Sequence, residues 1–231
     1  MSLSVCMAVH NGELFLQQQI ESILAQLKPE DELIISDDAS TDATLDIIKS
    51  YVDPRIHLLP PRRFYNPARN FEYALSHCKN EIIFLADQDD VWHPQKIEVM
   101  VNELALFDLV VCDCRLIDET GNVLSESFFA SNNSQNGLVK NLLKNSFVGC
   151  CMAFQRIVVQ RILPFPPKIS MHDQWIGLIA QRHFSVKFIP QTLVDHRRHN
   201  GNYSSTGERS KNSWNKKVIS RLLLAKALWQ H

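Results

Sequence analysis

The chain has 231 residues, which is enough for one large domain or for a nucleotide-sized half joined to a smaller one. Its 24 basic and 25 acidic side chains give a net charge of -1, which excludes a strong overall field for nucleic acid or for bulk attraction to an anionic membrane. The sequence contains no run of about 18 apolar residues, the length that a helix needs to span a bilayer, and residues 1–25 lack a secretion-signal pattern. We therefore expect a cytoplasmic protein with a small partner.

In the first half, near-continuous apolar runs alternate with helical patterns. We expect strands at residues 3–8, 32–36, 56–59, 81–86 and 109–112, and helices at 16–27, 44–51, 68–78 and 94–107. Buried strands that alternate with helices predict an α/β fold with a mostly parallel sheet that is covered on both faces.

The second half has a different pattern. A polar loop over 125–137 is rich in Ser and Asn and is predicted to be mobile or to form a lid. A strand is predicted at 146–154, and helices at 157–163, 172–181 and 214–229. The last helix carries basic and Trp side chains, so it packs on the protein body, packs on a further C-terminal piece, or docks on a membrane surface.

Six cysteines show no paired metal-knuckle spacing, and four of them lie in apolar runs. We expect reduced thiols buried in the core.

Three carboxylates, Asp87, Asp89 and Asp90, follow the strand at 81–86 within four residues. Such a cluster is costly unless a cation neutralises it, and acids at i and i+2 can bind a hard ion, Mg²⁺ or Mn²⁺, that carries a diphosphate. The alternative is a solvated turn that caps the helix near Pro94. Ligands of parallel sheets bind beyond the strand carboxyl ends, so this turn should meet 10–12 and Asp37-Asp38 at one edge.

Several ordered motifs over residues 3–202 resemble the inverting, nucleotide-sugar-dependent glycosyltransferases of family 2, which have the GT-A fold and include bacterial capsule, lipopolysaccharide and rhamnosyl transferases. The motifs that carry the resemblance are Leu3-Ser4-Val5-Cys6-Met7-Ala8-Val9-His10-Asn11-Gly12, Ile34-Ile35-Ser36-Asp37-Asp38-Ala39-Ser40-Thr41-Asp42, Asn66-Pro67-Ala68-Arg69-Asn70, Asp87-Gln88-Asp89-Asp90-Val91-Trp92, His172-Asp173-Gln174-Trp175 and Arg197-Arg198-His199-Asn200-Gly201-Asn202.

The resemblance implies a role for each matching residue. It implies a catalytic base at Asp173, a metal held by Asp89 and His199, acceptor binding at Gly149 and Trp175, and nucleotide-sugar binding at Ala8, His10, Asn11, Asp38, Arg69, Asp87 and Gln88. Structural alternatives stay open: helix capping for Asp38 and Asp173, a surface ion pair for Arg69, packing for Trp175 and His199, and a strand bend at Gly149.

The chain departs from the family pattern in its opening turn and before the base. Ala8-Val9-His10-Asn11 stands where the family's turn often reads Pro-Thr-Tyr-Asn, so a hydroxyl and a stacking tyrosine are missing, and His172 replaces the usual acidic residue before the base. The implied organisation is a nucleotide-sugar-binding half at 1–113, an acceptor-binding and catalytic-base half at 114–205, and a C-terminal amphipathic helix at 206–231.

The implied function is metal-dependent, inverting sugar transfer from a UDP- or dTDP-sugar to a hydroxyl of a bacterial surface glycan or lipid-linked precursor, with Mn²⁺ or Mg²⁺ as cofactor. The C-terminal helix would allow peripheral contact with the inner face of the membrane. The alternatives are a non-catalytic sugar- or partner-binding module and nucleotidyl transfer. Nucleotidyl transfer requires a glycine-rich phosphate loop, which residues 10–13 do not supply.

Overall fold

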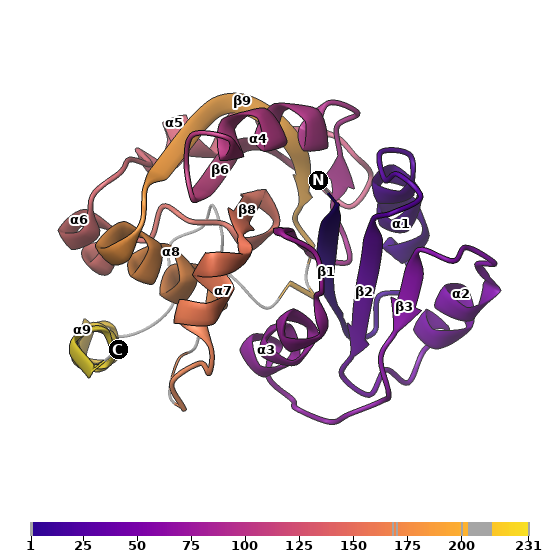
Figure 1. The fold of residues 1–231 in the computed structure, drawn as a ribbon, viewed down its shortest axis with the longest axis horizontal. Coiled ribbons are helices and arrows are strands. Elements are labelled where there is room, and N and C mark those ends of the chain that lie inside the picture. The colour runs from indigo at the N-terminus through magenta and orange to yellow at the C-terminus, as the bar shows by residue number, and fades with distance from the viewer. Residues whose placement is uncertain (1, 168, 170, 200, 203–213, 231) are drawn as a thin grey trace.

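The computed structural model describes residues 2–167, 169, 171–199, 201–202 and 214–230, with the side chains of 214–218 and 220 left out. Figure 1 shows the arrangement of the elements. The strands are β1 (Leu3–Val9), β2 (Glu32–Asp37), β3 (Ile56–Leu58), β4 (Ile82–Ala86), β5 (Val91–Trp92), β6 (Leu109–Ile117), β7 (Val123–Ser125), β8 (Met152–Gln155) and β9 (Val186–Arg197). The helices are α1 (Leu16–Leu24), α2 (Thr44–Ser50), α3 (Pro67–His77), α4 (Lys96–Leu104), α5 (Phe128–Asn132), α6 (Leu138–Leu143), α7 (Arg156–Ile162), α8 (His172–His183) and α9 (Trp214–Gln230).

One mixed sheet, with strand order β3-β2-β1-β4-β8-β6-β9-β5, forms the centre of the molecule, and β7 pairs with β6. The strands from β3 to β4 are parallel, as the continuous apolar runs predict. Beyond β4 the sheet becomes mixed, because β8 lies antiparallel between β4 and β6. The predicted boundary between 113 and 114 falls inside β6, so both predicted halves share this sheet.

The helices of the first half follow from local sequence. In α1, Leu16, Ile20 and Ile23 form the buried side of an amphipathic helix. In α3, the Asn66 side chain caps the helix by accepting from two backbone N–H groups, and Pro67 occupies the first turn, where a missing N–H costs nothing. Helix α3 packs on β1 and β2 and thereby places its start beside the carboxyl ends of those strands.

Three predicted features of the second half need correction. The segment 125–137 contains α5, because the buried Asp113 of β6 accepts from the Phe129 N–H at 2.9 Å and from the Ser127 hydroxyl. The strand predicted at 146–154 is shorter, since a 3₁₀ turn at Gly149–Cys151 precedes β8. The pattern also missed β9, which pairs in parallel with β6.

Helix α9 contacts α6 and α8, and the Arg182 guanidinium donates to the Leu228 carbonyl. Among the side chains that are described in this helix, Leu224 and Leu228 are buried, which favours packing on the protein body for this side of the helix. The predicted boundary at 205–206 lies outside the described residues. No described helix is both long enough and apolar enough to cross a membrane. All six cysteines are unpaired and buried, as expected.

Candidate active site

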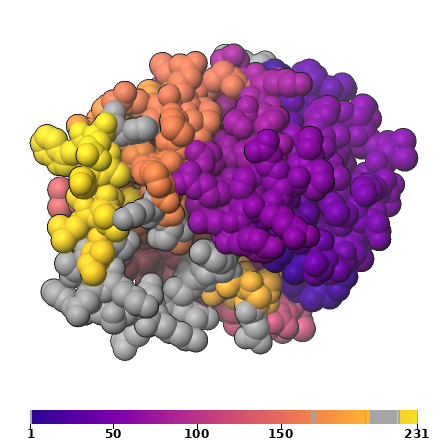
Figure 2. Space-filling view, turned by 90° about the horizontal axis from the view of Figure 1, so that it is seen from below, coloured from indigo at the N-terminus to yellow at the C-terminus, as the bar shows by residue number. Residues whose placement is uncertain are grey.

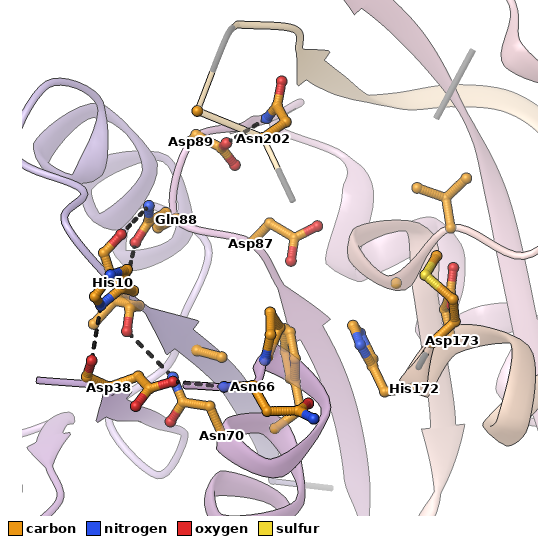
Figure 3. Close-up of a pocket in the computed structure, with 18 of the residues that line it drawn as sticks. His10, Asp38, Asn66, Asn70, Asp87, Gln88, Asp89, His172, Asp173 and Asn202 are labelled. Atoms are coloured by element: carbon orange, nitrogen blue, oxygen red, sulfur yellow. Dashed lines mark hydrogen bonds between the residues drawn. The ribbon is translucent and has the colours of Figure 1, made fainter. Parts of the chain in front are cut away.

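A cavity of about 400 Å³ opens beyond the carboxyl ends of β1, β2 and β4, where the sequence places it. Figure 3 shows His10 and Asp38 on one side of it, His172 and Asp173 on the other, and Asp87 between them. The predicted site residues that line the cavity are Ala8, His10, Asp38, Asp87, Gln88, Asp89, Gly149 and Asp173. Asn11, Arg69, Trp175 and His199 lie outside the lining.

Asp38 is buried, and its carboxylate accepts from three backbone N–H groups of the next loop. The donors are Phe64 at 2.5 Å, Tyr65 at 3.0 Å and Asn66 at 3.1 Å. Two carboxylate oxygens offer about four acceptor positions, so one remains for a ligand such as the imide N–H of a pyrimidine base. Asp38 therefore supports the wall of the cavity as well as facing into it.

His10 and Gln88 are locked together across the cavity edge. The His10 N–H donates to the Gln88 side-chain oxygen at 2.7 Å, and the Gln88 amide donates to the His10 carbonyl at 3.0 Å. A Cβ on Gly12 would lie 2.7 Å from the same Gln88 oxygen, so a side chain there would have to displace Gln88 from its bonds with His10. The His10 Nδ1 lies 2.7 Å from the Asp38 carbonyl and therefore carries the proton. Asn11 supports this wall from behind by accepting from the Thr41 N–H at 2.8 Å.

Arg69 points away from the cavity. Its guanidinium pairs with Glu72 and donates to the carbonyls of Phe165 and Pro166. The arrangement favours the ion-pair role that the sequence left open. These contacts join α3 to the proline-rich segment and do not direct the guanidinium toward a nucleotide-sugar.

The acid turn after β4 carries strongly perturbed carboxyl groups. Burial raises the pKa of Asp87 to about 8, and the nearby charges of Asp90 and Asp89 add to the rise. Burial alone would also raise the pKa of Asp90, but its ion pair with His196, at 2.8 Å, lowers it below the usual value. Crowded acids of this kind indicate a place where a cation is stabilised.

Asp89 and His199, the two predicted metal ligands, lie together although 110 positions separate them. The Asp89 Oδ2 atom accepts from the His199 Nε2 at 2.7 Å and from the Asn202 amide at 2.8 Å. A carboxylate oxygen beside an imidazole nitrogen suits Mn²⁺ better than Mg²⁺, which prefers oxygen ligands, so these residues fit a metal of the kind that the resemblance implies. Asn202 was missed as a site residue, although the late motif that contains it was recognised.

Arg197 fastens the acid turn to β9. Its backbone N–H donates to Asp90 at 3.0 Å, and its guanidinium donates to the Asp89 carbonyl at 3.0 Å and to Gln18 of α1 at 2.9 Å. The guanidinium also lies 4.6 Å from the Phe15 ring, whose other neighbour is His199. This buried arginine therefore holds Asp89 and His199 in one arrangement.

Asp173 lies in the first turn of α8 on the opposite wall. It does not cap the helix, since the N-cap residue is Met171. Burial raises the pKa of Asp173 to about 6, although the Gln174 N–H at 2.6 Å and the Asn145 amide at 3.2 Å stabilise the ionised form. A carboxylate with this pKa is ionised at neutral pH and is a stronger base than an exposed one.

His172 separates Asp173 from α3. Its ring stacks on Phe71 with centroids 4.0 Å apart, and burial lowers its pKa to about 3, so it is neutral. A Cβ at Gly149 would lie 2.6 Å from the His172 Nε2, which explains the glycine better than a strand bend does. Trp175 is fully buried and donates to the Ile162 carbonyl at 3.0 Å, which favours packing over stacking on a sugar.

The family model described as "Glycosyl transferase family 2" matches residues 4–163. A putative teichuronic acid biosynthesis glycosyltransferase, TuaG of Bacillus subtilis, is 26% identical over 98% of this chain and 92% of its own length. The chain spans less of other curated relatives, 66% of one from Rickettsia typhi and 37% of one from Bacillus subtilis.

Two solved structures share the fold. S. aureus TarS in complex with UDP-GlcNAc has a TM-score of 0.75 and 16% identity over 98% of this chain and 66% of its own. The mannosyltransferase PcManGT from Pyrobaculum calidifontis, in complex with GDP-Man and Mn²⁺, has a TM-score of 0.68 and 19% identity over 98% and 64%. These likenesses confirm the GT-A fold. Since the family model covers well over half of its residues, the chain belongs to glycosyl transferase family 2.

Proposed function

We propose that the protein transfers a sugar from a nucleoside diphosphate donor to an acceptor hydroxyl, with inversion. The observation that carries the proposal is that one cavity joins Asp38, the acid turn after β4 and Asp173. In this proposal Asp38 faces the nucleotide base, and the acid turn after β4, which carries Asp89 and is called the Asp89 turn below, faces the diphosphate. Asp173 lies on the opposite wall. An inverting transfer needs its general base on the side of the sugar opposite the leaving group.

In this proposal Asp173 accepts the proton of the acceptor hydroxyl while that oxygen attacks the anomeric carbon of the donor. The bond between this carbon and the diphosphate oxygen breaks, and the electron pair leaves with the nucleoside diphosphate. Asn145 holds the Asp173 carboxylate in place, and the neutral His172 adds no charge that would weaken the base. Asp89 and His199 would hold Mg²⁺ or Mn²⁺, which when bound neutralises charge on the leaving diphosphate.

We propose a UDP- or dTDP-sugar as donor and a bacterial surface glycan or its lipid-linked precursor as acceptor. The UDP-GlcNAc complex of TarS supports the uridine donor, and the naming of TuaG as a teichuronic acid biosynthesis glycosyltransferase supports the acceptor class. The polar contacts of Asp38 leave room for the imide N–H that uracil and thymine share.

Calorimetric titration with UDP, dTDP, GDP and CMP, each with and without Mn²⁺, tests the donor site. We expect UDP or dTDP to bind at least tenfold more tightly with Mn²⁺ present, because the diphosphate is then neutralised. CMP serves as the control, since it has no diphosphate. Failure of all four to bind the folded protein would contradict the donor site and favour a non-catalytic binding module.

We also propose that the protein contacts an anionic membrane through a surface formed by α6 and α9, two helices that touch each other. Figure 2 shows α9, in yellow, on the side away from the indigo and purple first half. Large apolar side chains are exposed there, with Leu222 65% and Trp229 82% exposed. The α6–α9 surface consists of Val139, Leu143, Ile219, Leu222, Leu223 and Trp229.

The charge around the α6–α9 surface supports an anionic membrane as its partner. Residues 127–172 and 209–231 contain no Asp or Glu, although the chain has 25 acidic residues. Lys140 of α6, Lys144 directly after it and Lys226 of α9 are exposed. An apolar surface with a tryptophan and a wholly basic surround fits the boundary of an anionic bilayer better than a protein partner, and a lipid-linked acceptor would be found there.

Sedimentation with lipid vesicles checks the membrane contact. The protein is expected to pellet with vesicles that contain phosphatidylglycerol and to stay in solution with phosphatidylcholine alone. Leu222→Glu should weaken the partitioning about tenfold or more, because it removes roughly 2 kcal/mol of apolar burial. Val52→Glu is the matched control, since Val52 is fully exposed on the donor half. Equal partitioning of the two variants would contradict the proposed surface.

A further inference from the structure

Below the acid turn, four ligating side chains from separate segments of the chain meet. Asp87 and Asp90 come from the turn after β4, Cys150 from the 3₁₀ turn before β8, and His196 from the end of β9. One ligand atom of each lies within 4.8 Å of the others. We call these four residues the Cys150 cluster. Its members are distinct from Asp89 and His199, the two predicted ligands of the donor metal.

We propose that the Cys150 cluster is a second metal site, for a borderline transition metal such as Zn²⁺. Asp90, Cys150 and His196 would form its core, and Asp87 would be the fourth ligand. One carboxylate pair, one thiolate and one imidazole make a ligand set that favours zinc over Mg²⁺ or Mn²⁺, because sulfur is a soft ligand. The Asp89–His199 pair has no sulfur and suits the harder ions.

The distances inside the cluster already approach those of a tetrahedral site. The His196 Nδ1 lies 2.8 Å from the Asp90 Oδ1 and 3.7 Å from the Cys150 Sγ. In a zinc site with bonds of about 2.0 Å to nitrogen and oxygen and about 2.3 Å to sulfur, neighbouring ligand atoms lie roughly 3.3–3.6 Å apart. The metal would occupy the place of the imidazole proton, and the thiol would bind as its thiolate.

Two further observations support a cation here. The Asp90 Oδ2 is buried and has no hydrogen-bond partner among the described residues, an arrangement that costs free energy unless another group, such as a cation bound to this carboxylate, satisfies it. The charges also balance. Two carboxylates and a thiolate would offset a divalent ion together with the buried Lys96 ammonium, which donates to the Cys150 carbonyl at 2.6 Å.

The cluster is accessible, because Asp87 and His196 both line the cavity. A metal bound there would engage Asp87, which the donor is expected to contact. Zinc should therefore compete with the nucleotide, a consequence that rests on the proposed function. The existence of the metal site does not rest on it.

Titration of the metal-free, reduced protein with Co²⁺ tests the proposal, since cobalt replaces zinc and reports thiolate ligation by a charge-transfer band in the near ultraviolet. We expect a band that saturates at one equivalent and disappears when Zn²⁺ is added. Cys150→Ser should abolish the band and weaken Co²⁺ binding at least tenfold. Cys151→Ser is the matched control, being the adjacent buried thiol outside the cluster, and should keep the band.

Absence of the band in the folded wild-type protein would overturn the proposal, and so would a band of unchanged intensity in Cys150→Ser. The wild-type titration decides the question even if that variant fails to fold. Asp89→Ala should retain the band, which separates this site from the donor metal. Nucleotide binding with Mn²⁺ is read independently, so failure of the donor site leaves the cobalt result intact.

Discussion

Replacing Asp173 with asparagine is expected to lower the rate of sugar transfer by about 10² to 10⁴-fold while leaving donor affinity unchanged. The loss has this size because a general base contributes that much to proton transfer, and the amide cannot accept the proton. Donor affinity is spared because Asp173 lies across the cavity from His10, Asp38 and the Asp89 turn. Radiolabelled sugar transfer measures the first quantity and calorimetry with the nucleotide measures the second.

The same experiment has a pH dependence with a defined sign. The base must be ionised, so wild-type turnover should fall as the pH drops through about 6, the pKa of Asp173. For stability the sign is opposite: a raised carboxyl pKa stabilises the fold below its ordinary value of 3.8, and this contribution is lost as the pH rises through about 6. The shift corresponds to about 3 kcal/mol, so Asp173→Asn should be no less stable than wild type at neutral pH.

Asp46→Asn, an exposed carboxylate on α2, is the control for this variant and should keep full activity. Near-normal turnover in Asp173→Asn would exclude it as the base. A loss of turnover together with a loss of donor affinity would show instead that the substitution had disturbed the cavity.

Replacing Asp89 with alanine is expected to remove the effect of Mn²⁺ on nucleotide binding. The Asp89 carboxylate accepts from both His199 and Asn202, so its loss removes a charged ligand and one hydrogen bond of each of the other two side chains. Even partners of metal ligands cost 10 to 100-fold in affinity when they are changed, and a direct ligand should cost at least as much. Calorimetry with and without Mn²⁺ measures the difference.

Glu98→Ala on the exposed side of α4 is the control for general effects of losing an acid. Asp89→Ala should also fold, since Arg197 fastens the turn through the Asp89 carbonyl and through Asp90, which both remain. An unchanged response to Mn²⁺ in Asp89→Ala would remove the metal role from this residue and would leave the Cys150 cluster as the place to look.

Local sequence was sufficient for the first half of the fold. Strands β2 and β4 are buried along their whole length, and β1 is buried except at Ala8, so their apolar runs carry the signal. Asn66-Pro67 marks the start of α3 without help from the rest of the chain. Strand β9 was missed because Lys187, Pro190 and Gln191 interrupt its apolar pattern; its place depends on pairing with β6.

Some residues of the candidate site could likewise be predicted from local sequence, and others could not. Residues that follow strand ends, such as His10, Asp38 and Asp87, line the cavity as predicted, because the sheet fixes where those ends meet. The direction of a side chain on a helix depends on what packs against it, and the sequence did not show that Trp175 faces the core or that Arg69 faces the segment around Pro166. Asn202 was missed because nothing in the surrounding sequence distinguishes this asparagine from others; its role depends on the contact with Asp89, which only the fold shows.

The three backbone N–H groups that Asp38 accepts have a consequence for how donor specificity can change. The side chain expected to face the nucleotide base also holds the loop that forms the adjoining wall. A substitution that altered base preference at this position would release residues 64–66 and reshape the cavity in the same step. We therefore expect donor preference to change more readily, in evolution or by engineering, through substitutions at neighbours such as His10 and Tyr65, with Asp38 left unchanged.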